Sequence, residues 1–143
     1  MPGGRPTDYN KEIATLICDR VATHACGLAK LCRMYDDMPD KSTINLWRYQ
    51  HEEFSSQYAR SKLIQADILA EECLDISDDD ADDVKYDKDG NEVYNAEFVA
   101  RSRLRIDTRK WLASKLLPKA YGDKTQEQKD TSNTLIEKLL EKL

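Results

Sequence analysis

Turn-forming residues divide the first third of this sequence into three helical segments, each too short to be stable by itself. Apolar residues recur at helical spacing between Ile13 and Val21, which predicts the first helix. Either Thr7 or Asp8 can cap its N-terminus. The pattern breaks before Gly27, a residue that suits the left-handed exit of a helix. Segments this short have to pack on one another, so we expect a small helical bundle.

The turn before the third helix is the most informative part of this bundle. The residue before a proline rarely adopts helical backbone angles, so the third helix should begin after Pro39. We expect Asp40 or Ser42 to cap it. Ile44 and Trp47 follow at helical spacing and are predicted to point inward. Three short helices with a turn before the third are the layout of a helix-turn-helix unit, whose third helix enters the major groove of DNA. A three-helix bundle that does not bind DNA fits the pattern equally well.

Two long helices are predicted in the middle of the sequence, joined by an acidic loop and a β-hairpin over residues 77–95. The fourth helix is expected over about residues 53–76. Its apolar residues spread around much of the circumference, which suggests burial between subunits. The fifth helix is expected over about residues 95–117 and is ended by Pro118.

The C-terminal segment combines a polar stretch with a short amphipathic pattern. Residues 122–134 show no core pattern, and Ser132 or Thr134 can cap a last helix. The apolar stripe of that helix is too short to fold alone and consists of Leu135, Ile136, Leu139, Leu140 and Leu143.

The net charge of −5 conceals three blocks of different sign. Residues 1–70 hold nine basic and nine acidic side chains, residues 71–97 hold two and twelve, and residues 98–143 hold eleven and six. An acidic total argues weakly against nucleic-acid binding, because DNA contacts depend on local patches.

No pattern in the sequence predicts catalysis, a cofactor or a metal site. The phosphate-binding Gly-x-x-x-x-Gly-Lys motif is absent, and both histidines, His24 and His51, fall at predicted helix ends. The cysteines lack zinc spacing, and the hairpin lacks ligands at both ends of a calcium loop centred on Gly90. No apolar run is long enough to span a bilayer and no secretion signal is recognisable, so we expect a reduced cytosolic setting.

Four sequence strings resemble the small terminase subunits of tailed phages, in particular the family of the Shigella phage Sf6 packaging protein. These strings are Gly-Arg-Pro-Thr-Asp-Tyr at 4–9, Met-Pro-Asp-Lys-Ser-Thr at 38–43 with Trp47, Arg-Leu-Arg-Ile-Asp-Thr-Arg-Lys-Trp at 103–111, and Leu-Pro-Lys-Ala-Tyr-Gly-Asp-Lys at 117–124. The regions of resemblance, 5–54 and 101–124, cover over half of the chain in the family's order.

The resemblance implies a mainly α-helical, non-enzymatic protein with three parts. Residues 1–54 form a helix-turn-helix DNA-binding domain, residues 55–121 a central oligomerisation domain, and residues 122–143 a tail for ring closure or large-subunit contact. A short C-terminal β element is also implied. The subunits form a homo-oligomeric ring, from octamer to decamer with the octamer preferred. The ring marks viral double-stranded DNA for packaging and passes it to the large subunit, which holds the ATPase and nuclease. This work takes place in the host cytoplasm, and the protein is not a virion component.

Candidate DNA-binding residues lie on and around the second and third predicted helices. The basic ones are candidates for phosphate contacts, while hydroxyl and amide side chains at the third helix can reach phosphate or base edges. The family often has an arginine before the inward tryptophan, where this sequence has Leu46, so individual contacts do not carry over. The candidates are Arg5, Lys30, Arg33, Lys41, Ser42, Thr43, Asn45 and Arg48.

Arginines among leucines on the fifth helix predict the subunit interface. Arg101, Arg105 and Arg109 recur every four residues, and buried arginines need acidic partners. Arg105 and Arg109 are therefore expected to pair with carboxylates from the end of the fourth helix or with Asp107, at least one across a subunit boundary. A basic channel lining that faces DNA is the alternative. The interface candidates are Glu71, Glu72, Asp75, Arg105, Arg109 and Trp111.

Two other classes of protein share parts of this pattern. A phage or prophage transcriptional regulator also uses a helix-turn-helix unit, but it usually acts as a dimer that spaces two heads one DNA turn apart. A scaffold or adaptor would make no DNA contact. The mass of the assembly separates these classes, because a ring favours the terminase and a dimer the regulator.

Overall fold

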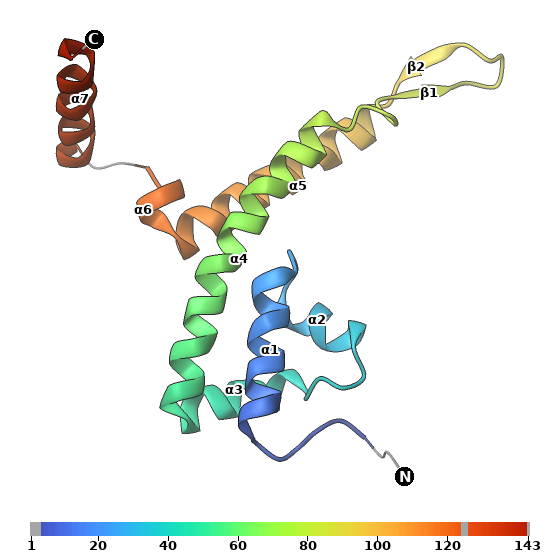
Figure 1. The fold of residues 1–143 in the computed structure, drawn as a ribbon. Helices are drawn as coiled ribbons and strands as arrows, with labels where there is room; N and C mark the ends of the chain where they lie inside the picture. The colour runs from blue at the N-terminus through green and yellow to red at the C-terminus, as the bar shows by residue number, and fades with distance from the viewer. Residues whose placement is uncertain (1–3, 124–125, 143) are drawn as a thin grey trace.

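The computed structural model describes residues 4–123 and 126–142, and the side chains of 126–132 lie outside this description. A helical head leads into a long helix that pairs with a second one, and a β-hairpin projects from the far end of that pair (Figure 1). The predicted mainly α-helical fold is thus confirmed. No described helix is long and apolar enough to cross a membrane.

The head begins with α1 (Lys11–Thr23), α2 (Leu28–Met34) and α3 (Lys41–Gln50). The prediction of the first cap was wrong, because the Asn10 side chain accepts a hydrogen bond from the Ile13 amide at 2.9 Å. Tyr9 explains the later start. Its ring stacks on His51 with the centroids 3.7 Å apart, which holds the preceding chain against the head.

Two other local predictions about the head differ from the structure. Gly27 has an ordinary φ of −73° and stands at the N-cap of α2, so it is not a left-handed helix exit. Asp40 does occupy the N-cap position of α3, but its side chain makes no capping hydrogen bond. Instead its Oδ1 lies 3.4 Å from Nε of Arg5, so an ion pair replaces the cap.

The core of the head draws on four helices rather than three. Ile17, Leu31 and Ile44 are at most 1 % exposed, and Phe54 and Tyr58 from the next helix join them at 0 % and 3 %. Packing of the head therefore continues past residue 54. The predicted domain boundary at that residue cuts through the contacts that stabilise the head.

The long helix α4 (Glu52–Asp78) belongs to both the head and the central hairpin. Its first half packs on α1 and α3, and its second half packs along α5 (Ala96–Leu116), as the two predicted long helices require. Gln65, which is 3 % exposed, joins α4 to the head. Its Nε2 donates to the carbonyl oxygens of His24 and Cys26 at 2.8 and 3.0 Å.

The predicted hairpin is present between α4 and α5. Strands β1 (Val84–Tyr86) and β2 (Glu92–Tyr94) are antiparallel, with Val84 opposite Tyr94. At the turn, Asp87 Oδ1 accepts hydrogen bonds from the amides of Asp89 and Asn91, both at 2.9 Å. Gly90 has a φ of 80°, a conformation that other residues adopt with strain.

The C-terminal region is helical and not part of a sheet. A short helix α6 (Pro118–Tyr121) follows α5, and the Tyr121 hydroxyl donates to Asp67 Oδ1 at 2.7 Å. The last helix α7 (Gln126–Glu141) begins well before the predicted caps at 132 or 134. Its first turns are rich in glutamine, glutamate and lysine, which favour helix without an apolar pattern. Residues 96–123 and 126–142 contain no strand, so the implied C-terminal β element is absent from this described part.

Candidate nucleic-acid interface

Two buried side chains set the rotation of α3 about its own axis. Ile44 is 0 % and Trp47 4 % exposed, which confirms the prediction that both point inward. With 3.6 residues per turn, the opposite side of the helix must carry Ser42, Asn45, Leu46 and Tyr49. We call these four residues the outer face of α3. All four are exposed, and Tyr49 is 90 % exposed.

Leu46 and Tyr49 are residues that the sequence reasoning did not nominate for DNA binding. Leu46 is 51 % exposed, and Tyr49 lies one turn further along the same side. Nothing within the described chain covers either of them. The signal was available, because placing Ile44 and Trp47 inward on a helical wheel also places these two outward.

A cluster of contacts stiffens the turn that precedes α3. The Arg20 guanidinium pairs with Asp37, with Nη2 and Oδ2 3.0 Å apart, and lies 3.8 Å from the centre of the Tyr35 ring. The Tyr35 hydroxyl lies 2.7 Å from Nε2 of His24 at the end of α1. The hydrogen bond from Arg20 holds the pKa of the Asp37 carboxyl below its usual value. The start of α3 is thereby held against α1.

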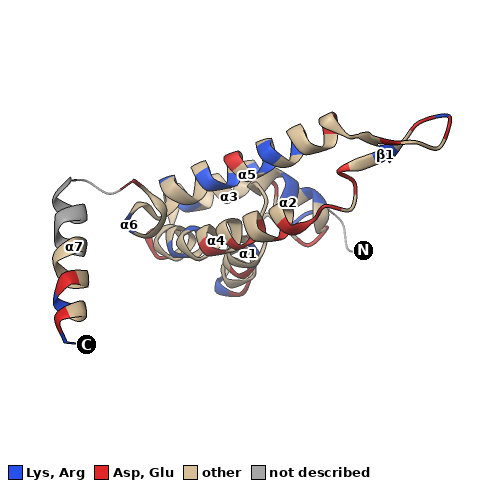
Figure 2. Cartoon of the chain, turned by 90° about the horizontal axis from the view of Figure 1, so that it is seen from above, with Lys and Arg blue, Asp and Glu red and all other residues tan. Residues whose placement is uncertain are grey.

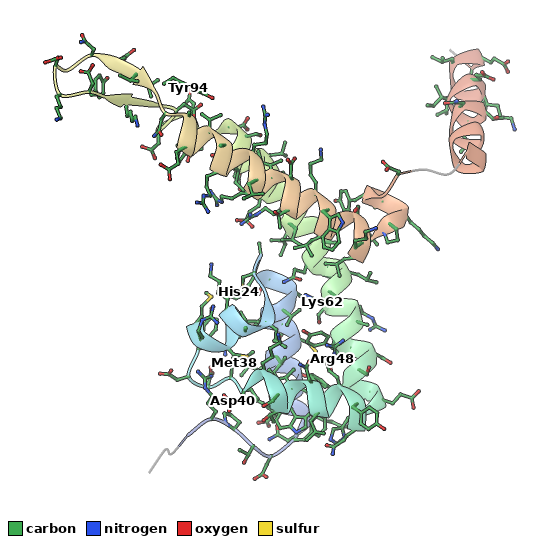
Figure 3. All side chains as sticks on the ribbon, turned by 180° about the vertical axis from the view of Figure 1, so that it is seen from behind. His24, Met38, Asp40, Arg48, Lys62 and Tyr94 are labelled. Carbon is green, nitrogen blue, oxygen red and sulfur yellow. The ribbon has the colours of Figure 1, made fainter. Side chains whose placement is uncertain are left out.

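Arg5 serves this same turn. Its Nη1 donates to the carbonyl oxygens of Tyr35 and Met38 at 3.1 and 2.9 Å, and its Nε faces Asp40. Figure 3 shows Met38 and Asp40 at this turn. The guanidinium is therefore engaged inside the subunit, which gives Arg5 a structural role beside the predicted phosphate contact.

The other predicted phosphate-binding residues are free to reach a ligand. Lys30 and Arg33 are exposed on α2, and Lys41 is exposed at the start of α3. Ser42 is exposed, whereas Thr43 is half-buried. The first-turn amides of an α-helix have no partner within the helix, so this end of α3 offers N–H groups together with the Lys41 ammonium.

Arg48 lies at the edge of the outer face of α3, on the flank that is next to α4. Its guanidinium stands 4.1 Å from the centre of the Tyr58 ring, and Nη1 donates to Asn45 Oδ1 at 3.3 Å. Lys62 of α4 lies on the same side of the head (Figure 3). Burial, and then repulsion by Arg48, lower the pKa of Lys62. The sequence did not nominate Lys62, because only the fold brings these two cations together.

The predicted arginine pairing on α5 is present for one of two residues. Arg109 Nε lies 3.3 Å from Glu72 Oε2, and both side chains are largely buried, at 18 % and 32 % exposed. Arg105 is exposed and has no ion pair within the described residues. The pair that forms lies within one subunit, so a pair across a subunit boundary stays a prediction.

The remaining interface candidates have no partner contact that would test their role. Glu71 and Asp75 are exposed on α4, and Trp111 is 60 % exposed on α5. The two histidines make contacts within the head: His24 with Tyr35, and His51 with Tyr9. Among the side chains that the structure describes, those of residues 4–123 and 133–142, no three histidine, cysteine or acidic groups are placed to hold a metal ion.

Comparison with known proteins finds a family whose model matches most of the chain. Residues 9–128 match the model of the family described as Bacteriophage Sf6, terminase small subunit-like. A solved structure of the terminase small subunit gp1 of the bacterial virus Sf6, carrying a single substitution, is 38 % identical; the alignment covers 85 % of this chain and 87 % of that one, with a TM-score of 0.65. Two other substituted forms align at the same identity over 82 % of their length, with a TM-score of 0.66. No sequence among the curated proteins matches.

Proposed function

This chain belongs to the Sf6 terminase small subunit-like family, and we propose that its head binds viral double-stranded DNA through the outer face of α3. As a small terminase subunit it recognises DNA and regulates the large subunit, to which catalysis belongs. We place its work in the host cytoplasm, where the large subunit packages DNA into procapsids. From this division of labour we expect that the chain needs no cofactor of its own.

One observation carries the DNA-binding proposal: a rigidly held helix presents an exposed polar and apolar face with nothing to cover it. Ser42 and Asn45 offer hydrogen bonds to base edges or phosphates, while Leu46 and Tyr49 offer apolar contact with a thymine methyl group. Lys41 flanks this face at the helix start. A helix in the major groove needs this combination of base-reading centre and basic flank.

A single head should bind weakly, because its basic and acidic residues nearly balance. Repetition of the head around a ring raises the effective concentration of the contacts and supplies the missing affinity. Lys30, Arg33, Lys41 and Arg48 then each add phosphate contacts in every subunit, with Thr43 at the margin of the helix start.

The test uses the whole chain and two kinds of substitution. Lys41→Ala with Arg48→Ala should weaken binding to all DNA sequences and flatten its salt dependence. Tyr49→Ala should instead reduce the preference for the viral packaging site over unrelated DNA, by up to the roughly 1–3 kcal/mol that one mismatched base pair costs. If both variants bind viral DNA as the unsubstituted chain does, with the same salt slope, the outer face of α3 is not the site.

The central hairpin is proposed to assemble the ring, from octamer to decamer with the octamer preferred. Exposed Trp111, Glu71, Asp75 and Arg105 support this role, because a single subunit leaves them uncovered. Native mass spectrometry gives the subunit number directly. A dimer would contradict the ring and favour a transcriptional regulator.

The tail is proposed to bind the large subunit through α7. Leu135, Ile136, Leu139 and Leu140 are all more than half exposed, and α7 packs on no other described element. An amphipathic helix of this kind suits an apolar groove on a partner. The competing possibility is that α7 closes the ring's own end. A cavity of about 630 Å³ lies beside Trp111 and Tyr121 of the subunit.

Two matched substitutions distinguish docking of α7 on the large subunit from closure of the ring by α7. Leu139→Lys should abolish stimulation of the large subunit while ring mass and DNA binding stay unchanged, and Glu137→Lys on the polar side should have little effect. Loss of the ring in Leu139→Lys would show that α7 closes the assembly instead.

A further inference from the structure

The hairpin that projects from the central helices has no partner in its own subunit. We call residues 79–95 the arm. The arm continues past the ends of α4 and α5 and points away from the head (Figure 1). Within the described residues, its strands pack only on each other. A two-stranded hairpin is at best marginally stable in water, so an arm of this kind calls for a surface to cover it.

The root of the arm prevents it from folding back on its own α5. Asn95 holds this root with its backbone amide on the Asp83 carbonyl at 2.8 Å and its Nδ2 on the Asp82 carbonyl at 2.9 Å. Its Oδ1 accepts from the Phe98 amide at 3.3 Å and so caps α5. These bonds align the arm with the helices. A partner must therefore come from another chain.

The arm offers a face that is both apolar and acidic. Residues opposite each other in an antiparallel pair share a face, so Val84, Tyr86 and Tyr94 lie together, 44 %, 69 % and 64 % exposed. The arm as a whole holds seven acidic and two basic side chains. None of the ion pairs among the described residues includes an arm carboxylate.

The side of α5 that points away from α4 offers the matching combination. Arg101, Leu104, Trp111 and Lys115 lie within about a quarter turn of one another on a helical wheel, and all four are exposed. We call them the outer face of α5. Leu104 and Trp111 are 59 % and 60 % exposed, and the helix holds six basic and two acidic side chains. Figure 2 shows the basic bands along α5 and the acidic residues at the arm.

From this match we propose that the arm of one subunit docks on the outer face of α5 in the next subunit. The inference rests on the proposed ring. A ring needs two different surfaces on every subunit that complement each other, whereas a symmetric dimer joins a surface to its own copy. Arm against arm, or α5 against α5, would bring like charges together. DNA does not suit the arm either, because both are acidic.

The test exchanges charges across the proposed contact in the full chain. Asp80→Lys with Asp82→Lys reverses the arm, and Arg101→Glu with Lys115→Glu reverses the outer face of α5. Each pair alone should raise the subunit concentration needed for ring assembly by about tenfold or more, because the lost attraction is repeated at every interface. All four substitutions together should restore assembly. Glu12→Lys with Asp19→Lys, on exposed α1 positions, is the matched control and should leave assembly unchanged.

A second variant tests the apolar part of the contact. Tyr86→Ser with Tyr94→Ser should weaken assembly to a similar degree at all salt concentrations, whereas the charge reversals should act most strongly at low salt. Circular dichroism should report the same helix content in every variant. Mass photometry across a dilution series measures the assembly.

Three outcomes would overturn the inference. Rings of unchanged stability in both charge-reversed variants would show that the arm does not join subunits. If the variant with all four substitutions fails to assemble, the arm and the outer face of α5 are not partners. Unchanged rings that lose DNA affinity after Arg101→Glu would make α5 a basic channel lining. If the unsubstituted chain forms no ring, the proposed ring itself is wrong. If it forms a ring that the charge reversals do not weaken, only the proposed contact of the arm is wrong.

Discussion

Gln65 of α4 connects the long helix to the head by hydrogen bonds. Its side-chain amide donates both hydrogens to backbone carbonyls of the α1–α2 turn, at 2.8 and 3.0 Å, and its Oε1 accepts from Lys62 at 2.8 Å. The side chain is 3 % exposed, so water cannot replace these partners. We predict that Gln65→Met, which keeps the volume and removes the donors, destabilises the fold.

The magnitude follows from the groups left without a partner. Two part-buried carbonyl oxygens, those of His24 and Cys26, lose their donors, and each unsatisfied group costs about 1–3 kcal/mol when water cannot reach it. Some relaxation at the turn reduces the sum, so we expect a loss of about 2–4 kcal/mol in the free energy of unfolding. For a chain of this length that corresponds to a fall of roughly 10 °C in the melting temperature.

The assay is thermal unfolding at one fixed subunit concentration, because assembly makes the melting temperature depend on concentration. Gln57→Met is the matched control, since Gln57 lies two turns earlier on α4 and its side chain has no such buried bonds. A loss in Gln65→Met below about 1 kcal/mol, or equal to that of the control, would refute the reasoning.

Three further predictions concern other parts of the fold. Arg109→Ala should lower the free energy of unfolding by about 1–3 kcal/mol, between the values for exposed and buried pairs, because Glu72 loses its partner; Glu72→Gln in the same background should add little. The lowered pKa of Asp37 means that its contact with Arg20 is fully present above about pH 4 and is lost as the pH falls further. Asp37→Asn should therefore weaken the dependence of the melting temperature on pH below about pH 4. Phe54→Ala should cost about 3–5 kcal/mol of head stability, and a fragment that ends at residue 54 should unfold readily, both measured by denaturant titration.

Features that depend on neighbours in sequence were predictable. The third helix after Pro39, the inward Ile44 and Trp47, and the hairpin around Gly90 were all predicted and are present. Turn chemistry and helical period act over a few residues, so a sequence shows them directly. The fourth and fifth helices were recognised for the same reason.

Helix boundaries at which several local signals compete were predicted less well. Thr7, Asp8 and Asn10 are all good helix caps, and the packing of Tyr9 selects the last of them. The last helix begins at Gln126, because helix propensity extends it beyond its apolar stripe. Where residues favour helix but show no apolar periodicity, the sequence does not mark where the helix begins.

The sequence by itself determined a helical head with its third helix oriented by Ile44 and Trp47, and it supplied the arginines of α5. Only the tertiary structure decided which partner each charged group meets. It joins Arg109 to Glu72 rather than to Glu71 or Asp75, turns Arg5 into the turn before α3, and leaves Tyr49 uncovered. Long, flexible charged side chains pair with whatever the fold brings within a few ångströms, and that distance is set by packing between helices far apart in the sequence.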